Sequence, residues 1–324
     1  MNKESHHIPV LLNEIIDILS PTSEGIYIDG TIGLGGHTSA ILDASTPNGR
    51  VIGIDLDPYA LELVKNRLGN PKNRLTLVHG NFRNLDQILV QNSVTAVDGI
   101  LLDLGVSSMQ LNTPERGFSF LNPGQLDMRM NPSQRISALK IVNETKTEEL
   151  ANIIYEFGEE RWSRRIARAI ERVRQRNRIT TTQQLAEIIS AAMPRKKRYQ
   201  KIHPATRTFQ ALRISVNQEL ENLDIVLNHA ITALKPGGKL CVISFHSLED
   251  RIVKRRFREL GKPSNDFSPR STHQNLRPPS IKIVTKRPIT ASEDEISTNF
   301  RARSAKLRVC IKICESGIMN QTFI

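Results

Sequence analysis

The sequence has little cysteine, few aromatic residues and no apolar run of membrane length. Its only cysteines are Cys241, Cys310 and Cys314, and they form no CxxC pair. This excludes a disulfide framework and a cysteine-based zinc site. The longest apolar runs, such as LCVISF at 240–245, have the length of a strand. The first residues, MNKESHHIPVLLNEIIDIL, contain no long apolar core, so we expect no signal peptide, no membrane partner and a cytoplasmic protein.

Positive charge is what the composition has in excess. Lys and Arg number 45 against 33 Asp and Glu, which gives a formal net charge of +12 and a pI of about 9.8. This balance favours an anionic partner, and nucleic acid first. The chain has 324 residues and 39% hydrophobic content, enough for one or two domains with cores of their own. His6 and His7 are interpreted as surface residues, and we expect no metal site.

Strands and helices alternate over the first hundred residues. The apolar, β-branched runs are typical of a parallel sheet that is covered on both faces. Pro58 stands at the first turn of a helix, where its missing N–H is harmless. The predicted strands are 26–29, 51–55, 75–80 and 99–105, and the predicted helices are 36–44 and 58–68.

The alternating pattern stops after Ser108 and resumes near Leu212. Residues 109–135 read as a loop and 147–193 as helices, the last opened by a capping box of Thr181 and Gln184. The later predicted elements are a helix ending at 235–238 with Gly237 as its stop, a strand at 239–245, a helix at 248–260, and closing strands at 281–286 and 305–313.

This order of elements predicts an α/β fold with an inserted domain. We expect a doubly wound, mainly parallel, Rossmann-like sheet built from residues 1–108 and 213–324. Residues 109–212 would form an all-helical domain inserted into it.

A glycine-rich turn follows the first predicted strand, in the sequence DGTIGLGGHT at 29–38. Such glycines allow a backbone to approach a ligand closely. The spacing is not the G-x-G-x-x-G of dinucleotide folds. It resembles motif I of class I methyltransferases that use S-adenosylmethionine (SAM). Thr31 departs from that motif, where many members have glycine, and because a β-branched residue disfavours positive φ the turn must differ there.

Two residues at the ends of later strands are candidate cofactor contacts. Asp55 ends the second strand, where an acid can accept both ribose hydroxyls of the ligand. It could instead cap the next helix, although Asp57 would serve equally well. Phe82 follows the third strand and could pack on an adenine or belong to the core.

Three residues after the fourth and fifth strands are candidates for catalysis. Asp103 could accept a hydrogen bond from an exocyclic base amine, which localises the nitrogen lone pair for attack on a methyl donor. It could equally contact the amino group of SAM. His246 and Ser247 either line the pocket for the base or cap the following helix, with Ser247 as N-cap and Asp250 as its reciprocal partner.

Several long strings together resemble one family, the bacterial 16S rRNA cytosine-N4 methyltransferases, also called RsmH or MraW. The resemblance runs from residue 7 to about 310, with small departures at Ala291 and Phe300. Its strings are HIPVLLNE, DGTIGLGGHT, DLGVSSMQL, GFSF, GEERWSRRIARAI, HPATRTFQALRISVNQEL, KPGGKLCVISFHSLEDRIVK and RARSAKLR.

The resemblance implies SAM-dependent methylation of N4 of a cytosine in the decoding centre of 16S rRNA, within the 30S subunit. For His37 and Gln110 it is the only ground for a cofactor role, and it favours that role for Phe82. Oligomeric state stays open between monomer and homodimer. The SAM contacts that it implies are Gly35, Gly36, His37, Asp55, Phe82, Asp103 and Gln110.

Basic residues are concentrated in one part of the chain. Residues 161–213 contain fifteen Arg or Lys and only two acids. In the helix RWSRRIARAIERV, Trp162, Ile166, Ala169 and Val173 form an apolar stripe and the arginines fall largely elsewhere. Such a charge run is either a solvated face or a phosphate-binding face, and we prefer the second. The candidate RNA contacts are Arg161, Arg164, Arg165, Arg168, Arg195, Lys196, Lys197, Arg198, Lys201 and Arg207.

Three other functions compete with this interpretation. A methyltransferase acting on DNA cytosine is disfavoured by the helical insert and by the missing Pro-Pro motif after Asp103. A non-catalytic RNA-binding protein is disfavoured by the intact glycine turn, by Asp55 and by Asp103. A dinucleotide oxidoreductase is disfavoured by the glycine spacing.

Overall fold

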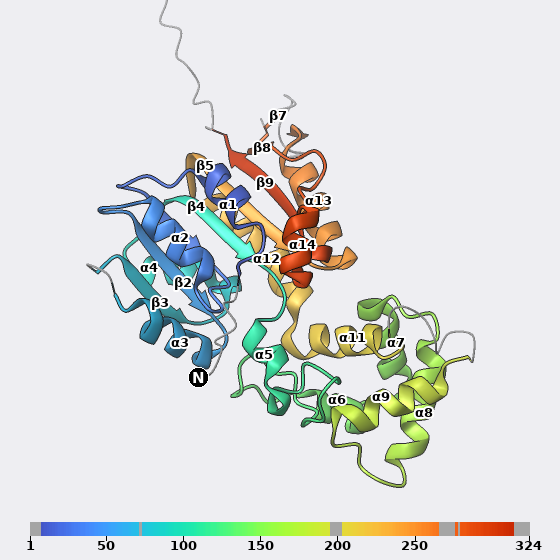
Figure 1. The fold of residues 1–324 in the computed structure, drawn as a ribbon. Helices are drawn as coiled ribbons and strands as arrows, with labels where there is room; N and C mark the ends of the chain where they lie inside the picture. The colour runs from blue at the N-terminus through green and yellow to red at the C-terminus, as the bar shows by residue number, and fades with distance from the viewer. Residues whose placement is uncertain (1–7, 71–72, 195–202, 266–275, 278, 314–324) are drawn as a thin grey trace, which may run out of the picture. The chain divides into compact units, whose positions relative to one another are not determined.

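The chain forms two compact units in the computed structural model shown in Figure 1. The first combines Met1–Gly105 with Glu221–Ile324, and the second is Val106–Leu220. No helix in the described ranges is both long and apolar enough to cross a membrane. The structure describes residues 8–70, 73–194, 203–265, 276–277 and 279–313.

A seven-stranded sheet forms the centre of the first unit. Its strand order is β3-β2-β1-β4-β5-β9-β8; the first five strands are parallel, and β9 and β8 are antiparallel to their neighbours. The predicted doubly wound, mainly parallel fold class is confirmed. The strands are β1 Ile26–Asp29, β2 Arg50–Asp55, β3 Leu75–His79, β4 Val97–Asp103, β5 Leu234–Ser244, β8 Ile281–Ile283 and β9 Lys306–Lys312.

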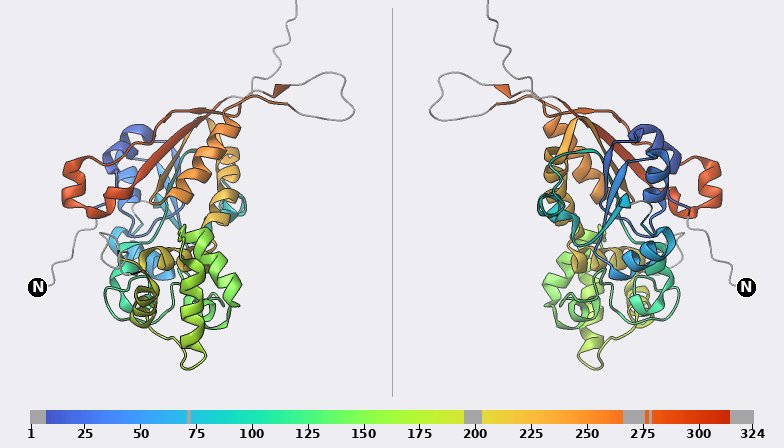
Figure 2. Two further views of the ribbon diagram at one scale, coloured as in Figure 1. Left: turned by 90° about the vertical axis from the view of Figure 1, so that its right-hand side faces the viewer. Right: turned by 90° about the vertical axis from the view of Figure 1, so that its left-hand side faces the viewer.

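Helices cover both faces of this sheet because consecutive strand residues point to opposite sides. Ile100 and Leu102 of β4 pack in one core, and Leu101 between them packs in the other. Helices α4, α12 and α13 cover the first face, and α1, α2 and α3 cover the second, as Figure 2 shows. The helices are α1 Leu12–Leu19, α2 Gly36–Ala44, α3 Pro58–Leu68, α4 Leu85–Gln91, α12 Glu219–Ala233, α13 Ser247–Leu260 and α14 Glu293–Thr298.

The junction between α12 and β5 differs from the prediction. Helix α12 ends at Ala233, and β5 begins at Leu234 rather than at 239. Gly237 therefore does not stop the helix; it takes a positive φ of 81° inside the extended segment. Val97 pairs with Leu234 and Gly99 with Lys239, so the register of β5 against β4 shifts around this glycine.

The second unit is helical and has its own apolar core. Leu150, Ile154, Ile166, Leu185 and Phe209 are among the core residues, from four different helices. The capping box of Thr181 and Gln184 that the sequence predicts opens α9. The helices are α5 Ser108–Asn112, α6 Ala138–Glu144, α7 Thr147–Gly158, α8 Ser163–Arg174, α9 Thr182–Ala192 and α11 Thr206–Asn217.

The buried face of α8 differs in part from the predicted stripe. Ile166 and Ala169 are buried as expected, but Ile170 joins them, whereas Trp162 and Val173 are 39% and 37% exposed. The predicted stripe was too long because both outer residues stand at the ends of a short helix, where the core no longer covers them.

One arginine of this unit is structural. The side chain of Arg174 is 10% exposed. It donates from Nη1 to the carbonyl of Val142 at 2.7 Å, from Nη2 to the carbonyl of Thr145 at 2.7 Å and from Nε to the Glu171 carboxylate at 2.8 Å. Thr147 donates its hydroxyl to the same carboxylate at 2.7 Å, and this bond, followed by that from Arg174, lowers the pKa of Glu171. The network joins α8 to the loop between α6 and α7.

Replacing Arg174 by Ala should therefore destabilise the helical unit. The change leaves two carbonyls without their donor and removes one of several donors to Glu171, a loss of about 2–4 kcal/mol in the free energy of unfolding. The single tryptophan, Trp162, lies in this unit, so urea unfolding followed by its fluorescence reports the unit selectively. The control is Arg172→Ala, which removes an exposed arginine of the same helix and should change stability by less than about 0.5 kcal/mol. Equal effects of the two changes would contradict the structural role.

Candidate active site

The candidate site lies where the parallel strands end. The chain runs from β1 outward to β3 and then returns to β4 beside β1, so the strand order reverses between β1 and β4. Open α/β sheets bind ligands in the crevice at this point, beyond the carboxyl ends of the strands. In the first unit, this edge carries the predicted residues Gly35, Gly36, His37, Asp55, Phe82, Asp103, His246 and Ser247.

A buried carboxylate organises the glycine turn. Asp29 ends β1, is 1% exposed and accepts the hydroxyl of Thr38 at 2.7 Å. It also accepts the backbone N–H of Thr31 at 3.3 Å. Burial raises the pKa of Asp29, and the nearby His37 and these hydrogen bonds oppose that rise. The first residue of the turn is thereby tied to the first turn of α2.

The turn takes positive φ only at glycines. Gly33 and Gly35 have φ of 51° and 72°, whereas Thr31 is absent from the residues with positive φ. The β-branched side chain of Thr31 is therefore unstrained. This agrees with the expectation that the turn differs from the family motif where threonine replaces glycine. The Thr31 hydroxyl accepts the backbone N–H of Asp103 at 2.6 Å. The threonine links the end of β1 to the end of β4, a role that glycine could not fill.

Asp55 is held by the turn and does not cap a helix. Its Oδ2 accepts the N–H of Gly33 at 2.9 Å and its Oδ1 accepts the N–H of Asp57 at 2.9 Å. The N-cap of α3 is Asp57, whose side chain accepts from Tyr59. Burial raises the pKa of Asp55 to about 6. Each carboxylate oxygen keeps a second lone pair, which fits the expected contact with two ribose hydroxyls.

Asp103 has an unsatisfied buried oxygen. Its Oδ1 is buried without a hydrogen-bond partner in the described part of the chain, and its Oδ2 lies 3.7 Å from Nδ1 of His37. Burial raises the pKa of Asp103 to about 6; His37 lowers it, and Asp29 and Glu249 raise it further. A buried acceptor of this kind does not cap a loop. It is able to accept a hydrogen bond from a ligand.

His37 lies beside Asp103. The imidazole is 6% exposed, and its Nε2 lies 3.0 Å from the carbonyl of Val10. Since that carbonyl can only accept, Nε2 carries a proton and Nδ1 faces the carboxylate of Asp103. The sequence alone indicated only a residue in the first turn of a helix.

The remaining glycines and Phe82 pack on protein. A β-carbon at Gly36 would lie 2.3 Å from Cγ of Pro9, and one at Gly35 would lie 3.1 Å from Cγ2 of Val64. Their side-chain directions are thus filled by the fold, and only their backbone can face a ligand. Phe82 is half-buried, packs on the core and lies beside Gly30. Its expected contact with adenine stays a prediction.

The start of α13 differs from the prediction. The N-cap is His246, not Ser247, and its reciprocal partner is Glu249, not Asp250. The His246 Nδ1 accepts the N–H of Glu249 at 3.4 Å, while Oε2 of Glu249 accepts the N–H of Phe245 at 2.8 Å. Asp250 instead pairs with Arg308 at 2.6 Å. Histidine is outside the usual set of N-cap residues, which is why the sequence pattern selected serine.

Glu249 is a site residue that the sequence analysis missed. It is 2% exposed, and its charge acts on Asp103. Oε1 of Glu249 lies 3.1 Å from Nε2 of His246, although the contact lacks hydrogen-bonding geometry. The signal was present as His-x-x-Glu directly after a buried strand, a capping box with an unusual first residue. The catalytic roles of His246 and Ser247 stay predictions.

Gln110 and the arginines belong to the helical unit. The Gln110 side chain accepts the N–H of Ser107 at 3.1 Å and closes the capping box of α5. Arg207 donates to the carbonyl of Glu159 at 3.0 Å. On α8 and the residue pair before it, Arg161, Arg164, Arg165 and Arg168 are exposed and have no ion pair within the described ranges. The predicted contacts Arg195, Lys196, Lys197, Arg198 and Lys201 lie outside the described residues.

Comparison with known proteins agrees with this geometry. The fold and the acids at the strand ends fit a class I methyltransferase. Residues 4–313 match the model of the MraW methylase family, so the chain belongs to that family. It is 51% identical to ribosomal RNA small subunit methyltransferase H of Halothermothrix orenii, over 95% of this chain and 98% of the relative. It is 48% identical to the protein of the same name from Heliobacterium modesticaldum, over 95% and 99%.

Among solved structures, an rRNA methylase from Streptococcus thermophilus resembles the chain with a TM-score of 0.41 at 10% identity, covering 95% of this chain and 99% of that one. The methyl donor of this class is SAM, as predicted. The residues at the sheet edge fit it: Asp55 is free of a capping role, and Asp103 offers a buried, unsatisfied oxygen. Within the first unit, Asp55, Phe82 and Asp103 would hold the cofactor, which supplies an electrophilic methyl group.

Replacing Asp103 by Asn should stabilise the protein in neutral solution without SAM. The folded-state pKa is raised from 3.8 to about 6, so rising pH removes stability between these two values. Above pH 6 the buried charge lowers the free energy of unfolding on the order of 2–3 kcal/mol, which the amide avoids. Urea unfolding of both proteins at pH 4 and pH 8, followed by circular dichroism, measures the difference. The exposed Asp43→Asn on α2 is the control, and an equal pH dependence in wild type and Asp103→Asn would contradict the burial argument.

Proposed function

We propose that this protein transfers the methyl group of SAM to N4 of a cytosine in the decoding centre of small-subunit ribosomal RNA. The relatives that share about half of its sequence carry the name of a small-subunit rRNA methyltransferase. The single structural observation that carries the proposal is the orphaned Oδ1 of Asp103 at the sheet edge. The exocyclic amine of a base can donate a hydrogen bond to this oxygen.

Asp103 would activate the amine by accepting its N–H. The lone pair of a cytosine N4 is delocalised into the ring, and a carboxylate that accepts one N–H localises it for in-line attack on the methyl group. With a pKa of about 6, Asp103 is a stronger acceptor than an ordinary carboxylate yet is ionised at neutral pH. The surplus proton of the methylated amine then passes to this carboxylate or to water.

His37 would orient that carboxylate as an imidazolium, because a neutral ring that donates from Nε2 has no proton on Nδ1. Because Nε2 is fixed by the carbonyl of Val10, the ring cannot turn away, and Nδ1 stays 3.7 Å from Oδ2 of Asp103. Oδ1 is thereby left to face the substrate. The alternative, in which Oδ1 accepts from the amino group of SAM, would place Asp103 in cofactor binding rather than in activation of the base.

The helical unit would bind the RNA backbone. The exposed arginines of α8 and its N-terminal approach have no ion pair in the described ranges, whereas Arg174 of the same helix is fully used inside the unit. An arginine that stabilises nothing internally is available for a phosphate. The target base must leave its stack to reach a methyl donor.

The first experiment is methyl transfer from radiolabelled SAM to small ribosomal subunits from cells that lack this activity. The RNA is digested to nucleosides, and we expect label in N4-methylcytidine only. The Asp103→Asn variant keeps the shape of the site but loses the charged acceptor, and its rate should fall by at least 100-fold. SAM affinity, measured by calorimetry on the same variant, separates the two roles of Asp103. A fall in rate with unchanged affinity supports activation of the base.

Other outcomes of this experiment would contradict the proposal. Label in another nucleoside would retain the enzyme class and refute the target. Label in duplex DNA offered as acceptor, with none in subunits, would favour the DNA enzyme. No SAM binding at all would favour a non-catalytic RNA-binding protein.

The arginines of α8 should control the salt dependence of RNA binding. Replacing Arg164, Arg165 and Arg168 by Ala removes three cations, and each phosphate contact adds about 0.7 to the slope of log K against log salt concentration for single strands. We expect the slope for subunit binding to fall by about 2. Arg178→Ala is the control, since Arg178 is exposed but already paired with Glu144 at 3.3 Å. An unchanged slope would show that α8 does not face the RNA.

A further inference from the structure

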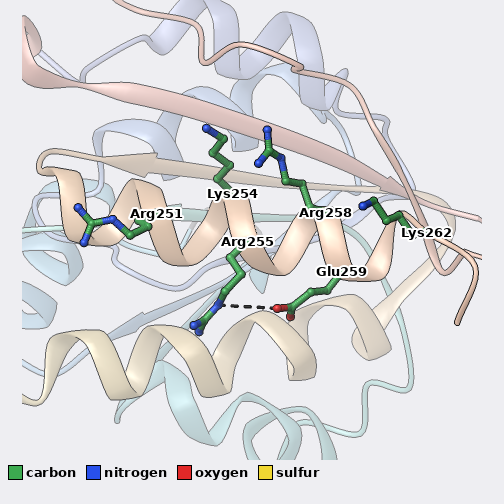
Figure 3. Close-up of a pocket in the computed structure, with 6 residues that line it drawn as sticks. All are labelled: Arg251, Lys254, Arg255, Arg258, Glu259 and Lys262. Atoms are coloured by element: carbon green, nitrogen blue, oxygen red, sulfur yellow. Dashed lines mark ion pairs between the residues drawn. The ribbon is translucent and has the colours of Figure 1, made fainter.

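The exposed side of α13 carries an open hollow lined almost entirely by cations. Figure 3 shows its six lining residues along the helix. The hollow has a volume of about 340 Å³. Five are basic and one is acidic, and all six are exposed. They are Arg251, Lys254, Arg255, Arg258, Glu259 and Lys262.

The acid in this group does not neutralise the cations that dominate it. Glu259 lies 3.8 Å from Arg255 and 3.5 Å from Arg256, and Asp224 is also shared by these two arginines. Within the described ranges, Lys254, Arg258 and Lys262 have no ion-pair partner. Like charges this close repel one another, so the arrangement lowers the stability of the free protein unless an anion is bound.

The helix dipole explains only part of the pattern. Cations are favourable in the last turn of a helix, which accounts for Arg258 and for Lys262 just beyond the end. Arg251 and Lys254 lie in the middle of α13, outside its last turn, where the dipole gives a cation no such gain. The opposite side of the helix buries Val253 and Phe257 against the sheet, at 1% and 2% exposure. The basic face is therefore directed outward.

We propose that this basic face of α13 binds the phosphate backbone of the substrate RNA, as a second RNA surface on the catalytic unit. The inference rests on the proposed function. The cations recur every three or four residues, so neighbours lie about 5–6 Å apart in a row. An open row without an aromatic residue or a glycine loop suits a chain of phosphates and does not read bases. His246 is the N-cap of α13, so the row starts at Arg251, within about two helical turns of the candidate active site.

The test compares two double variants of the full-length protein. Lys254→Gln with Arg258→Gln removes two cations of the α13 face. Lys65→Gln with Arg67→Gln removes one exposed lysine and one exposed arginine from α3, which covers the other face of the sheet. None of the four residues belongs to the candidate catalytic or cofactor machinery. The measurements are methyl transfer to small ribosomal subunits, its salt dependence, and SAM affinity by calorimetry.

For the α13 variant we expect the KM for subunits to rise roughly 10-fold at physiological salt, and the salt slope to fall by about 1.4. Its kcat and SAM affinity should stay within two-fold of wild type, and the α3 variant should match wild type throughout. An α13 variant with unchanged KM and slope, in a preparation whose wild type is active, would overturn the inference and leave the proposed function intact. A wild type that is inactive on subunits would instead refute the proposed function.

A different anionic partner is a separate outcome. If binding to vesicles with anionic headgroups were lost in the α13 variant while the KM for subunits was unchanged, the face would be a lipid-binding surface, and the RNA inference would be wrong. If the α3 variant lost as much affinity for subunits as the α13 variant, the effect would be one of net charge, and a specific surface on α13 would be refuted.

Discussion

The candidate site depends on one buried carboxylate at the end of the first strand. Asp29 accepts the Thr38 hydroxyl and the Thr31 N–H, and so fixes the glycine turn against α2. The glycine turn then holds the residues at the ends of two other strands. The Gly33 N–H holds Asp55, and the Thr31 hydroxyl holds the backbone at Asp103. A short polar chain of contacts thus connects the ends of three parallel strands, and loss of its first acceptor would loosen all three.

Much of the fold was predictable because it follows from local patterns. The apolar runs that form the strands are too short for buried helices, so their length alone indicates strands. The capping box of Thr181 and Gln184 is a sequence pattern that marks the start of a helix directly. The errors occurred where tertiary contacts override local preference. His246 caps α13 because Glu249 lies buried behind it, and β5 extends through Gly237 because β4 offers it a partner.

The site residues were predictable to different degrees for the same reason. The position of Asp55 at the end of a strand predicted a ribose contact, and the structure removes the capping alternative because Asp57 caps α3. The ribose contact itself stays a prediction. The contact between His37 and Asp103 joins residues 66 positions apart (103 − 37), so no local pattern could predict it. Thr31 was visible only as a departure from a motif. Its function becomes clear only beside β4.

The placement of charge separates stability from function in this protein. Arginines that stabilise the fold, such as Arg174 and Arg308, are nearly buried and bonded to carboxylates. The exposed arginines of α8 and the exposed cations of α13 add little to the stability of the fold. Within each helix these like charges repel one another, which lowers that stability. The half-buried acids Asp55 and Asp103 oppose it in the same way, since partial burial raises the pKa of each to about 6. The fold thus retains two kinds of unfavourable charge, the acids at the sheet edge and the cations on the surface. Ligands that pair with these charges would stabilise it. A cationic methyl donor and an anionic RNA are complementary to these two sets.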